Sequence, residues 1–280
     1  MRTATLVTAL FCASAPWLAA QETKLTAEQI ERFLAEGKVV SQKSLGVGVT
    51  NSVRVKLQHE MATHDAHVQS IDESKATFTG NQGTELGFRD CYKFNVAAYK
   101  LDGMLGLNMT PPSVERKWGG KSSAFTWWVP NAMMEAERIK KGIKPPDPDL
   151  FNKQMYVVRV FDQLVFNVDR NLQNLLITED WRLWMIDHTR CFRLRKDLNA
   201  PKNLVRCERS LLAKLRTLDF ATLKAELGTL LRENEIKGMI ERRDKIVALF
   251  DAKIKAEGEE TVLYDLPARE RVWVVPAQAQ

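Results

Sequence analysis

The spacing of hydrophobic and polar residues differs between the two halves of the chain. In the first half, apolar residues recur every second position in short runs, which is typical of antiparallel strands. Three such runs occupy residues 39–40, 52–57 and 66–71. A further apolar run, Ala124–Val129, is stopped by Pro130 and is typical of a buried strand. The polar stretch 72–90 is expected to form a loop.

Two helices are predicted in the same half. Residues Thr26–Gln29 have the spacing of a capping box, so a helix should run over Ala27–Glu36 and end at Gly37. Apolar residues also recur at helical spacing over Tyr92–Leu105, where they would form one buried face. The first half is therefore predicted to be a sheet accompanied by two helices.

The second half is mostly helical in its pattern. Helices are predicted over residues 133–141, 150–166 and 208–257. Between them, Leu175–Ile177 and Leu183–Ile186 bracket a turn and should form a small hairpin. The proline-rich stretch Lys144–Pro148 is expected to be a hinge or linker, and the tail after Gly258 is expected to be irregular.

Length and composition limit how these segments can be arranged. A chain of 280 residues with 45% hydrophobic residues can bury one sizeable core or two small ones. A β-rich first half and a helical second half therefore indicate two lobes with a cleft between them. The net charge of +6 is mild, and the basic residues are spread along the chain. A nucleic-acid binder concentrates such charge on one face, so no nucleic-acid partner is expected.

The first residues have the features of an export signal. Arg2 supplies a positive charge, Ala4–Ala15 is a short apolar run, and Ala19-Ala20 provides small residues for cleavage. The run is too short to span a bilayer, and no later segment approaches that length. Residues 1–20 are therefore predicted to be a signal peptide, which makes the protein periplasmic or secreted. The alternative is a buried amino-terminal helix.

The mature chain would retain three cysteines, Cys91, Cys191 and Cys207. An odd number leaves at least one thiol outside any intramolecular bridge. Cys191 and Cys207 are the best candidates for a bridge because they would close a short loop. The alternative is that both are buried free thiols, since free cysteine is commonly found in cores.

Three polar side chains in the second half indicate the chemistry. Asp169 and Asn174 lie at the two ends of one loop, and Asp187 ends the second hairpin strand, which returns it to the side of Asn174. Phosphoryl transfer requires one carboxylate to deprotonate the attacking hydroxyl, and an amide and a second carboxylate to hold Mg²⁺. Because Mg²⁺ keeps several waters, two protein ligands suffice. The alternative is that these residues only cap turns, as Asp and Asn often do.

The spacing of these residues resembles that of protein kinases. Asp169-x4-Asn174, followed after 13 residues by Asp187, matches the catalytic-loop and metal-binding pattern. The residues of the motif are more similar to those of atypical relatives: the phosphatidylinositol 3-/4-kinase-like group, HipA-type kinases and secretory-pathway kinases of extracellular proteins and sugars. The segments Tyr92–Leu107 and Pro111–Arg116 are similar to the helix and following strand of the small lobe in these relatives.

The resemblance implies an α+β, two-lobed protein-kinase-like fold with a β-rich N-lobe and a helical C-lobe. The implied divisions are an N-terminal helix over 21–37, an N-lobe over 38–130, a C-lobe over 131–265 and a tail over 266–280. Asp169 would be the catalytic base, and Asn174 and Asp187 would be the metal ligands. ATP and Mg²⁺ would be the cofactors.

The small lobe would supply further nucleotide contacts. Gly46 and Gly48, in the turn between the first two strands, would form the phosphate loop. Trp128 would line the adenine pocket at the hinge. For Trp127-Trp128 the alternative is a buried core strand.

Two kinase residues are missing from their expected positions. Kinases pair a lysine on the third strand with a glutamate on the N-lobe helix to position the phosphates. Here the two positions hold Gln69 and Asn95. The candidate replacement lysines and their candidate partners are Lys56, Lys75, Lys93, Glu73 and Glu85.

The predicted function is phosphoryl transfer from ATP to a hydroxyl of a protein, sugar or lipid acceptor outside the cytoplasm. The alternative is a catalytically inactive, kinase-shaped module that binds a nucleotide or another partner. The intact set of Asp169, Asn174 and Asp187 favours the enzyme. The missing lysine–glutamate pair favours the binding module.

The export signal yields a direct prediction. The mature protein should begin near Gln21 and lie outside the cytoplasm, because the apolar run Ala4–Ala15 and the small residues Ala19-Ala20 direct cleavage there. Mass spectrometry of the native protein measures its first residue. Native protein that retains Met1–Ala20 would contradict the prediction.

Overall fold

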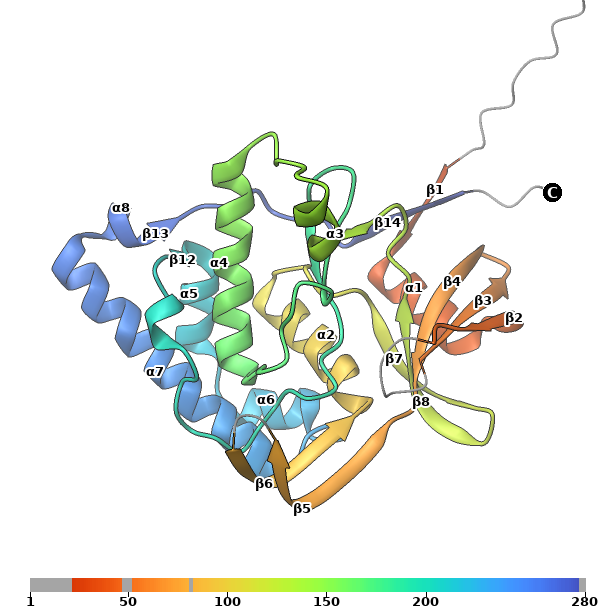
Figure 1. Ribbon diagram of the computed structural model, residues 1–280, viewed down its shortest axis with the longest axis horizontal. Helices are drawn as coiled ribbons and strands as arrows, with labels where there is room; N and C mark the ends of the chain where they lie inside the picture. The colour runs from red at the N-terminus through yellow and green to blue at the C-terminus, as the bar shows by residue number, and fades with distance from the viewer. Residues whose placement is uncertain (1–21, 47–51, 81–82, 277–280) are drawn as a thin grey trace, which may run out of the picture.

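A five-stranded antiparallel sheet forms the amino-terminal part of the molecule (Figure 1). The structure is a computed structural model that describes residues 22–46, 52–80 and 83–276. The sheet has the strand order β2-β3-β4-β8-β7. Its strands are β2 Lys38–Ser44, β3 Val53–His59, β4 Ala62–Gln69, β7 Ser113–Trp118 and β8 Lys121–Trp127. The four strands predicted from the apolar runs of the first half all lie in this sheet.

Helix α1 (Ala27–Glu36) covers one face of the sheet. The predicted capping box starts it: the side chain of Thr26 accepts from the Gln29 N–H, and the side chain of Gln29 accepts from the Thr26 N–H. The ring of Phe33 meets that of Trp127 edge-on, with centroids 5.6 Å apart. The core between helix and sheet contains Ile30, Phe33, Leu34, Val55, Leu57, Val68 and Trp127.

Residues 72–90, expected as a loop, form a long β-hairpin instead (Figure 1). Its strands are β5 (Asp72–Gly80) and β6 (Gly83–Cys91). The outer part of the hairpin is largely exposed, so its residues lack the alternation of apolar and polar positions by which a half-buried strand is recognised. Only the end of β6, Phe88–Cys91, is buried.

Helices make up most of the second half, as the helical spacing predicts. They are α3 Glu135–Lys140, α4 Pro148–Val165, α5 Arg209–Thr217, α6 Phe220–Leu227, α7 Glu233–Glu257 and α8 Glu259–Val262, with a 3-10 turn at Pro201–Asn203. The predicted hairpin is confirmed and gains a third strand, giving β9 Met133–Met134, β10 Leu175–Ile177 and β11 Leu183–Met185. Among the described helices, none is long and apolar enough to cross a membrane.

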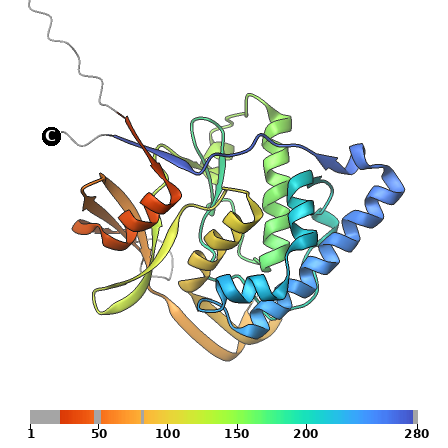
Figure 2. The ribbon, with the colours of Figure 1, turned by 180° about the vertical axis from the view of Figure 1, so that it is seen from behind.

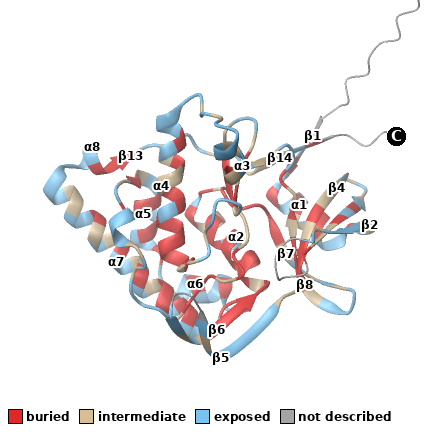
Figure 3. Cartoon of the chain, in the orientation of Figure 1, coloured by how far each residue is buried: buried red, intermediate tan, exposed pale blue. Residues whose placement is uncertain are grey.

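Helix α2 (Lys93–Leu105) lies in the middle of the molecule and is almost entirely buried (Figure 3). Its apolar side chains, including Phe94 and Leu101, belong to the large core formed with α4, α5 and α7. The helix ends at Gly106, whose φ of 71° is a conformation that glycine adopts at no steric cost. Since α2 also contacts β7 and β8, it joins the sheet to the helical part.

The tail after Gly258, expected to be irregular, is irregular only over residues 265–271; it otherwise forms the helix α8 and the strands β13 and β14 (Figure 2). The strands involved are β1 Glu22–Thr26, β12 Cys207–Glu208, β13 Leu263–Tyr264 and β14 Val272–Pro276. β13 pairs with β12, and β14 pairs with β1 beside the sheet. Between these pairs, Arg269 donates to the carbonyl oxygen of Leu183 (2.8 Å). Because these contacts are distant in sequence, the local pattern of the tail could not reveal them.

The cysteines Cys91, Cys191 and Cys207 are free and buried. The predicted Cys191–Cys207 bridge is therefore wrong, and the alternative of buried free thiols holds. All three pack in the large core. There burial raises the pKa of Cys91 to about 11 and that of Cys191 well above its usual value. Since the thiolate is the reactive form, these cysteines act as packing residues.

The docking of α1 on the sheet should contribute strongly to stability. Phe33 is fully buried against Trp127, so Phe33→Ala removes a large apolar side chain and leaves a cavity. We expect this variant to lower the free energy of unfolding by about 3–5 kcal/mol, measured by urea denaturation.

Arg32→Ala on the same helix is the matched control. Arg32 forms its ion pairs with Glu36 and Glu60 at the exposed surface. Exposed pairs contribute only about 0–1 kcal/mol, so this variant should remain close to the parent protein. Equal losses in the two variants would contradict the docking argument.

Candidate active site

The loop between α4 and β10 begins with a turn that fixes Asp169. Phe166 ends α4 in the left-handed conformation, with φ of 52°. The buried side chain of Asn167 donates from Nδ2 to Oδ1 of Asp162 (3.1 Å) and accepts from the backbone N–H of Asp169 (3.0 Å). Asp169 is held by these bonds at its backbone, while 48% of its side chain is exposed.

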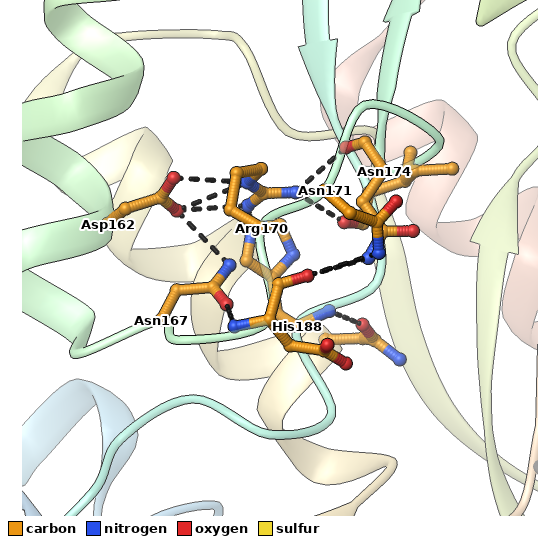
Figure 4. A network of polar contacts seen from close by, with 9 residues as sticks. Asp162, Asn167, Arg170, Asn171, Asn174 and His188 are labelled. Atoms are coloured by element: carbon orange, nitrogen blue, oxygen red, sulfur yellow. Dashed lines mark hydrogen bonds and ion pairs between the residues drawn. The ribbon is translucent and has the colours of Figure 1, made fainter. Parts of the chain in front are cut away.

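Arg170 is the centre of this loop (Figure 4). Its guanidinium forms an ion pair with Asp162 of α4 (Nη2 to Oδ1, 3.1 Å). From Nη1 it donates to the carbonyl oxygens of Asn174 (2.8 Å) and Ile186 (2.7 Å), and its Nη2 lies 3.0 Å from Nε2 of His188. One side chain therefore connects α4, the loop and the end of β11, and its N–H groups are all engaged.

His188 is a neutral hydrogen-bond acceptor in this network. A guanidinium can only donate, so Nε2 of His188 accepts from Arg170 and the ring proton resides on Nδ1. Burial lowers the pKa of His188 well below its usual value, and the positive charge of Arg170 lowers it further. The neutral ring therefore positions the loop and does not act as an acid toward a substrate.

The β10–β11 hairpin brings Asn174 and Asp187 to the same side, as predicted. The N–H of Ile186 donates to the carbonyl oxygen of Asn174 (3.1 Å), and Nδ2 of Asn174 donates to that of Asp169 (3.2 Å). Asp187 has φ of 55° and accepts from Oγ1 of Thr189 (3.2 Å). Asp169, Asn174 and Asp187, which we call the triplet, thus lie in one site.

Two oxygens of the triplet fit a magnesium ion. Asn174 donates from Nδ2 and Asp187 accepts at Oδ1, which leaves Oδ1 of Asn174 and Oδ2 of Asp187; no described residue donates to either of these two oxygens. Mg²⁺ prefers such hard oxygen ligands and completes its coordination with water and phosphate oxygens. Among the described residues, no three His, Cys, Asp or Glu side chains converge on one point. Oδ1 of Asn174 and Oδ2 of Asp187 therefore suit a metal that also takes ligands from water or phosphate.

A neutral bridge occupies the place of the kinase lysine–glutamate pair. Nδ2 of Asn95 on α2 donates to Oε1 of Gln69 on β4 (2.6 Å), and both side chains are buried. Oδ1 of Asn95 accepts the N–H of His188 (2.8 Å), the residue that follows Asp187. The two positions expected for the charged pair do face each other. Here, however, the neutral side-chain amides of Gln69 and Asn95 connect α2 to β4 and to the loop of Asp187.

The candidate replacement lysines form other contacts. The ion pairs of these residues are Lys56–Asp65 (3.5 Å), Lys75–Glu73 (3.2 Å), Lys93–Glu115 (4.0 Å) and Glu85–Arg193. Lys75 and Glu73 lie half-exposed on the β5–β6 hairpin. Lys56 lies on β3 opposite Asp65, and therefore on the same face of the sheet as Gln69. Its contact with the phosphates stays a prediction.

One face of β3 and β4 turns toward Asp187. His67 lies on this face, where burial lowers its pKa and the charge of Asp187 opposes that change. Arg54, directly opposite His67, lies over the ring of Trp128 with 4.1 Å from Cζ to the centroid. Trp128 is half-buried at the end of β8, so its contact with adenine stays a prediction. Trp127 points the other way into the core, so Trp127 is a residue of a buried core strand and does not line an adenine pocket.

The glycine turn after β2 is described only in part. Gly46 has φ of 60°, a conformation that favours glycine. Gly48 lies outside the described residues. The role of both in a phosphate loop stays a prediction.

Arg190 is a charged neighbour of the triplet that the sequence pattern did not reveal. Its Nε donates to Oδ2 of Asp90 (2.7 Å), and its Nη1 lies 3.8 Å from Oδ2 of Asp169. Arg190 and Asp169 also line a hollow of about 560 Å³ beside the β5–β6 hairpin. Asp90 and Arg190 are 100 residues apart, and no local motif connects them.

The comparisons with known proteins bear on the fold. No family model matches the chain, and no curated protein does. In shape, the chain is similar to a Fam20 protein of hydra solved with a sugar, with a TM-score of 0.66, 14% identity, and coverage of 85% of this chain and 92% of that one. It is similar also to the Golgi casein kinase, with a TM-score of 0.60, 12% identity, and coverage of 86% and 80%. The structure of the same kinase with Mn and ADP bound has a TM-score of 0.58 and 12% identity, with coverage of 86% of this chain and 80% of that one.

These likenesses show an atypical kinase-like fold. The predicted arrangement of a β-rich N-lobe and a helical C-lobe is confirmed. The roles predicted for Asp169, Asn174 and Asp187 stay predictions, because structural likeness at this identity concerns the fold alone.

The buried neutral His188 should make stability depend on pH. Its pKa is lower in the folded protein than in the unfolded chain, so the unfolded chain binds more protons below about pH 6.5. The contribution of His188 to stability should therefore fall as the pH decreases from 7 to 5, by up to about 1.4 kcal/mol per pH unit. Urea unfolding at pH 7, 6 and 5 measures the slope.

His188→Gln tests the assignment, because glutamine still offers an acceptor to Arg170 but does not titrate. The variant should be less stable than the parent at pH 7 and should show a shallower slope. The slope that remains comes from other buried groups: His64 and His67, whose pKa values burial lowers, add to it, and Asp102, whose pKa burial raises to about 7, opposes it. Identical slopes in the two proteins would contradict a neutral buried His188.

Proposed function

We propose that the protein is a kinase-like phosphotransferase that moves the γ-phosphoryl group of ATP to an acceptor hydroxyl. The observation that carries this proposal is the joint placement of Asp169, Asn174 and Asp187 by one loop and one hairpin of a kinase-like fold. The Golgi casein kinase with Mn and ADP supports a nucleotide and a divalent metal as cofactors. We assign these as ATP and Mg²⁺.

The proposed reaction gives each member of the triplet one task. Asn174 and Asp187 would hold Mg²⁺, which when bound supplies positive charge to the phosphates. Asp169 would orient the acceptor hydroxyl and take its proton while the new O–P bond forms and the bond to ADP breaks. The exposed carboxylate of Asp169 and its fixed backbone suit this task, since an acceptor can reach it from solvent.

The remaining parts of the proposal concern the nucleotide, the acceptor and the location. Gly46 and Gly48 would contact the phosphates, and Trp128 would contact adenine. The acceptor would be a hydroxyl of a protein, a sugar or a lipid; the hydra Fam20 structure with a sugar supports the second of these. The signal-like segment over residues 1–20 supports action in the periplasm or outside the cell.

A second function is favoured by the bridge between Gln69 and Asn95. Both side chains are neutral, so this site lacks the lysine with which kinases position the phosphates. The alternative is therefore a catalytically inactive, kinase-shaped module that holds a nucleotide or a partner without transfer.

Substitution of Asp187 tests the assignment to either function. We expect Asp187→Ala to abolish Mg²⁺-dependent ATP binding, because it leaves the phosphate charge uncompensated. Asp187→Asn is the sharper variant, since asparagine tolerates the left-handed φ of 55° and removes only the charge. Binding is measured as the rise in melting temperature with ATP, with and without Mg²⁺. Asp180→Ala, on the exposed turn of the same hairpin, is the matched control and should bind like the parent.

Substitution of Asp169 separates the enzyme from the binding module. Asp169→Ala should bind Mg-ATP nearly as the parent does and slow transfer by about 10²–10⁴-fold, the usual scale for losing a positioned base. Release of ADP, with or without added acceptor, measures the rate. If Asp187→Asn binds Mg-ATP like the parent, the kinase assignment fails. If Asp187 is required but the parent protein releases no ADP, the inactive module is correct.

A further inference from the structure

The neutral bridge leaves the phosphates of a bound nucleotide short of positive charge. Phosphoryl transfer is accelerated mainly by cations that stabilise the oxygens of the transferring group. Gln69 and Asn95 supply no charge, and Arg170 has none of its N–H groups left to offer. A cation close to the triplet would supply the charge that these three residues do not.

Arg190 is held in a suitable place. Its Nε is fixed by Asp90, which is only 3% exposed, and its Nη1 lies 3.8 Å from the candidate base Asp169. Within the described chain, Nη1 and Nη2 donate no hydrogen bond, so four of the five guanidinium N–H groups are free. Burial disfavours the charge of Arg190, but the hydrogen bond to Asp90 and the carboxylates of Asp169 and Asp187 raise its pKa above the usual value.

The space beside Arg190 can receive the acceptor. The hollow of about 560 Å³ is lined by Asp169 and Arg190 and by Phe78 and Phe88 of the hairpin. A hydroxyl that Asp169 deprotonates must therefore approach within reach of the guanidinium.

We propose that Arg190 is a catalytic residue that binds the γ-phosphoryl group during transfer, and that Asp90 is the positioning residue that aims it. This inference rests on the proposed function. The acceptor oxygen bonds to the γ-phosphorus while the bond from phosphorus to the bridging oxygen of ADP breaks. The hydroxyl proton passes to the carboxylate of Asp169. The guanidinium donates to the equatorial oxygens of the phosphoryl group, where charge is concentrated in the transition state.

The test compares a nucleotide that has a γ-phosphoryl group with one that lacks it. The probes are Mg²⁺ with ADP and Mg²⁺ with the non-hydrolysable β,γ-imido analogue of ATP, titrated against the full chain by calorimetry. In Arg190→Ala, affinity for the analogue should fall by about 10–100-fold, the scale of a lost charge-assisted hydrogen bond. Affinity for ADP should change less than about twofold. Arg195→Ala, on the rim of the same hollow and without an ion pair to Asp169, is the matched control for both probes.

Two further variants test whether misfolding or a merely structural role explains the loss of affinity. Arg190→Gln keeps a donor for Asp90 without the charge and should reproduce the selective loss if the alanine variant does not fold. Asp90→Asn should reduce affinity for the analogue and the rate of ADP release while ADP binding is unchanged, because a merely structural role would affect both nucleotides alike.

The outcomes separate this inference from the proposed function. Equal effects of Arg190→Ala on both nucleotides, or no effect on either, would overturn the role of Arg190. The same holds if the parent protein binds ADP and the analogue equally. Loss of Mg²⁺-dependent ADP binding in Asp187→Asn would still support the proposed function in each of these cases. Failure of that binding to depend on Asp187 would reject both.

Discussion

The buried ion pair between Arg170 and Asp162 is the interaction on which the rest of the site depends. Each side chain is only 10% exposed, and two charges removed from water are tolerated only when their remaining donors and lone pairs are satisfied. Arg170 meets this condition with two backbone carbonyls and with His188. The loop and the hairpin therefore cannot move independently of α4 without leaving a buried charge unpaired. The geometry of the triplet follows from this constraint.

A second constraint comes from α2 and differs in kind, because it carries no charge. Asn95 connects Gln69 on β4 to the backbone N–H of His188, and the helix that carries it packs in the large core of the helical part. Separating these buried amides would leave polar groups unsatisfied, which opposes movement of α2 relative to β4 and the loop of Asp187. The small lobe is thus joined to the loop of Asp187 by a rigid contact.

The sequence was informative where structure is local. The capping box of α1, the long helix α4 and the β10–β11 hairpin follow from short-range periodicity, and together they place Asp169, Asn174 and Asp187 correctly. Gln69 and Asn95 could be identified because the kinase pattern specifies which strand and helix should carry the pair. The triplet and its surroundings in the fold were therefore largely predictable.

What the sequence could not reveal depends on contacts between distant segments. The β5–β6 hairpin is exposed over most of its length, so it lacks the apolar alternation of a half-buried strand. The tail gains its strands only by pairing with β1 and β12. The pairing of Asp90 with Arg190 has no counterpart in any local motif. The cysteines were misjudged for a similar reason, because a short loop in sequence does not decide whether two thiols meet or pack separately in a core.

The pairing of β1 with β14 has a topological consequence. Glu22 lies opposite Pro276 and Thr26 opposite Val272, so the first and last described residues are neighbours. A short linker could close the chain into a ring, and the ring could be reopened in an exposed loop without cutting an element of the fold. The elements could thus follow one another in a different order along the chain and still form the same fold. A protein joined at Glu22 or at Pro276 would leave the molecule from the same corner of the small lobe.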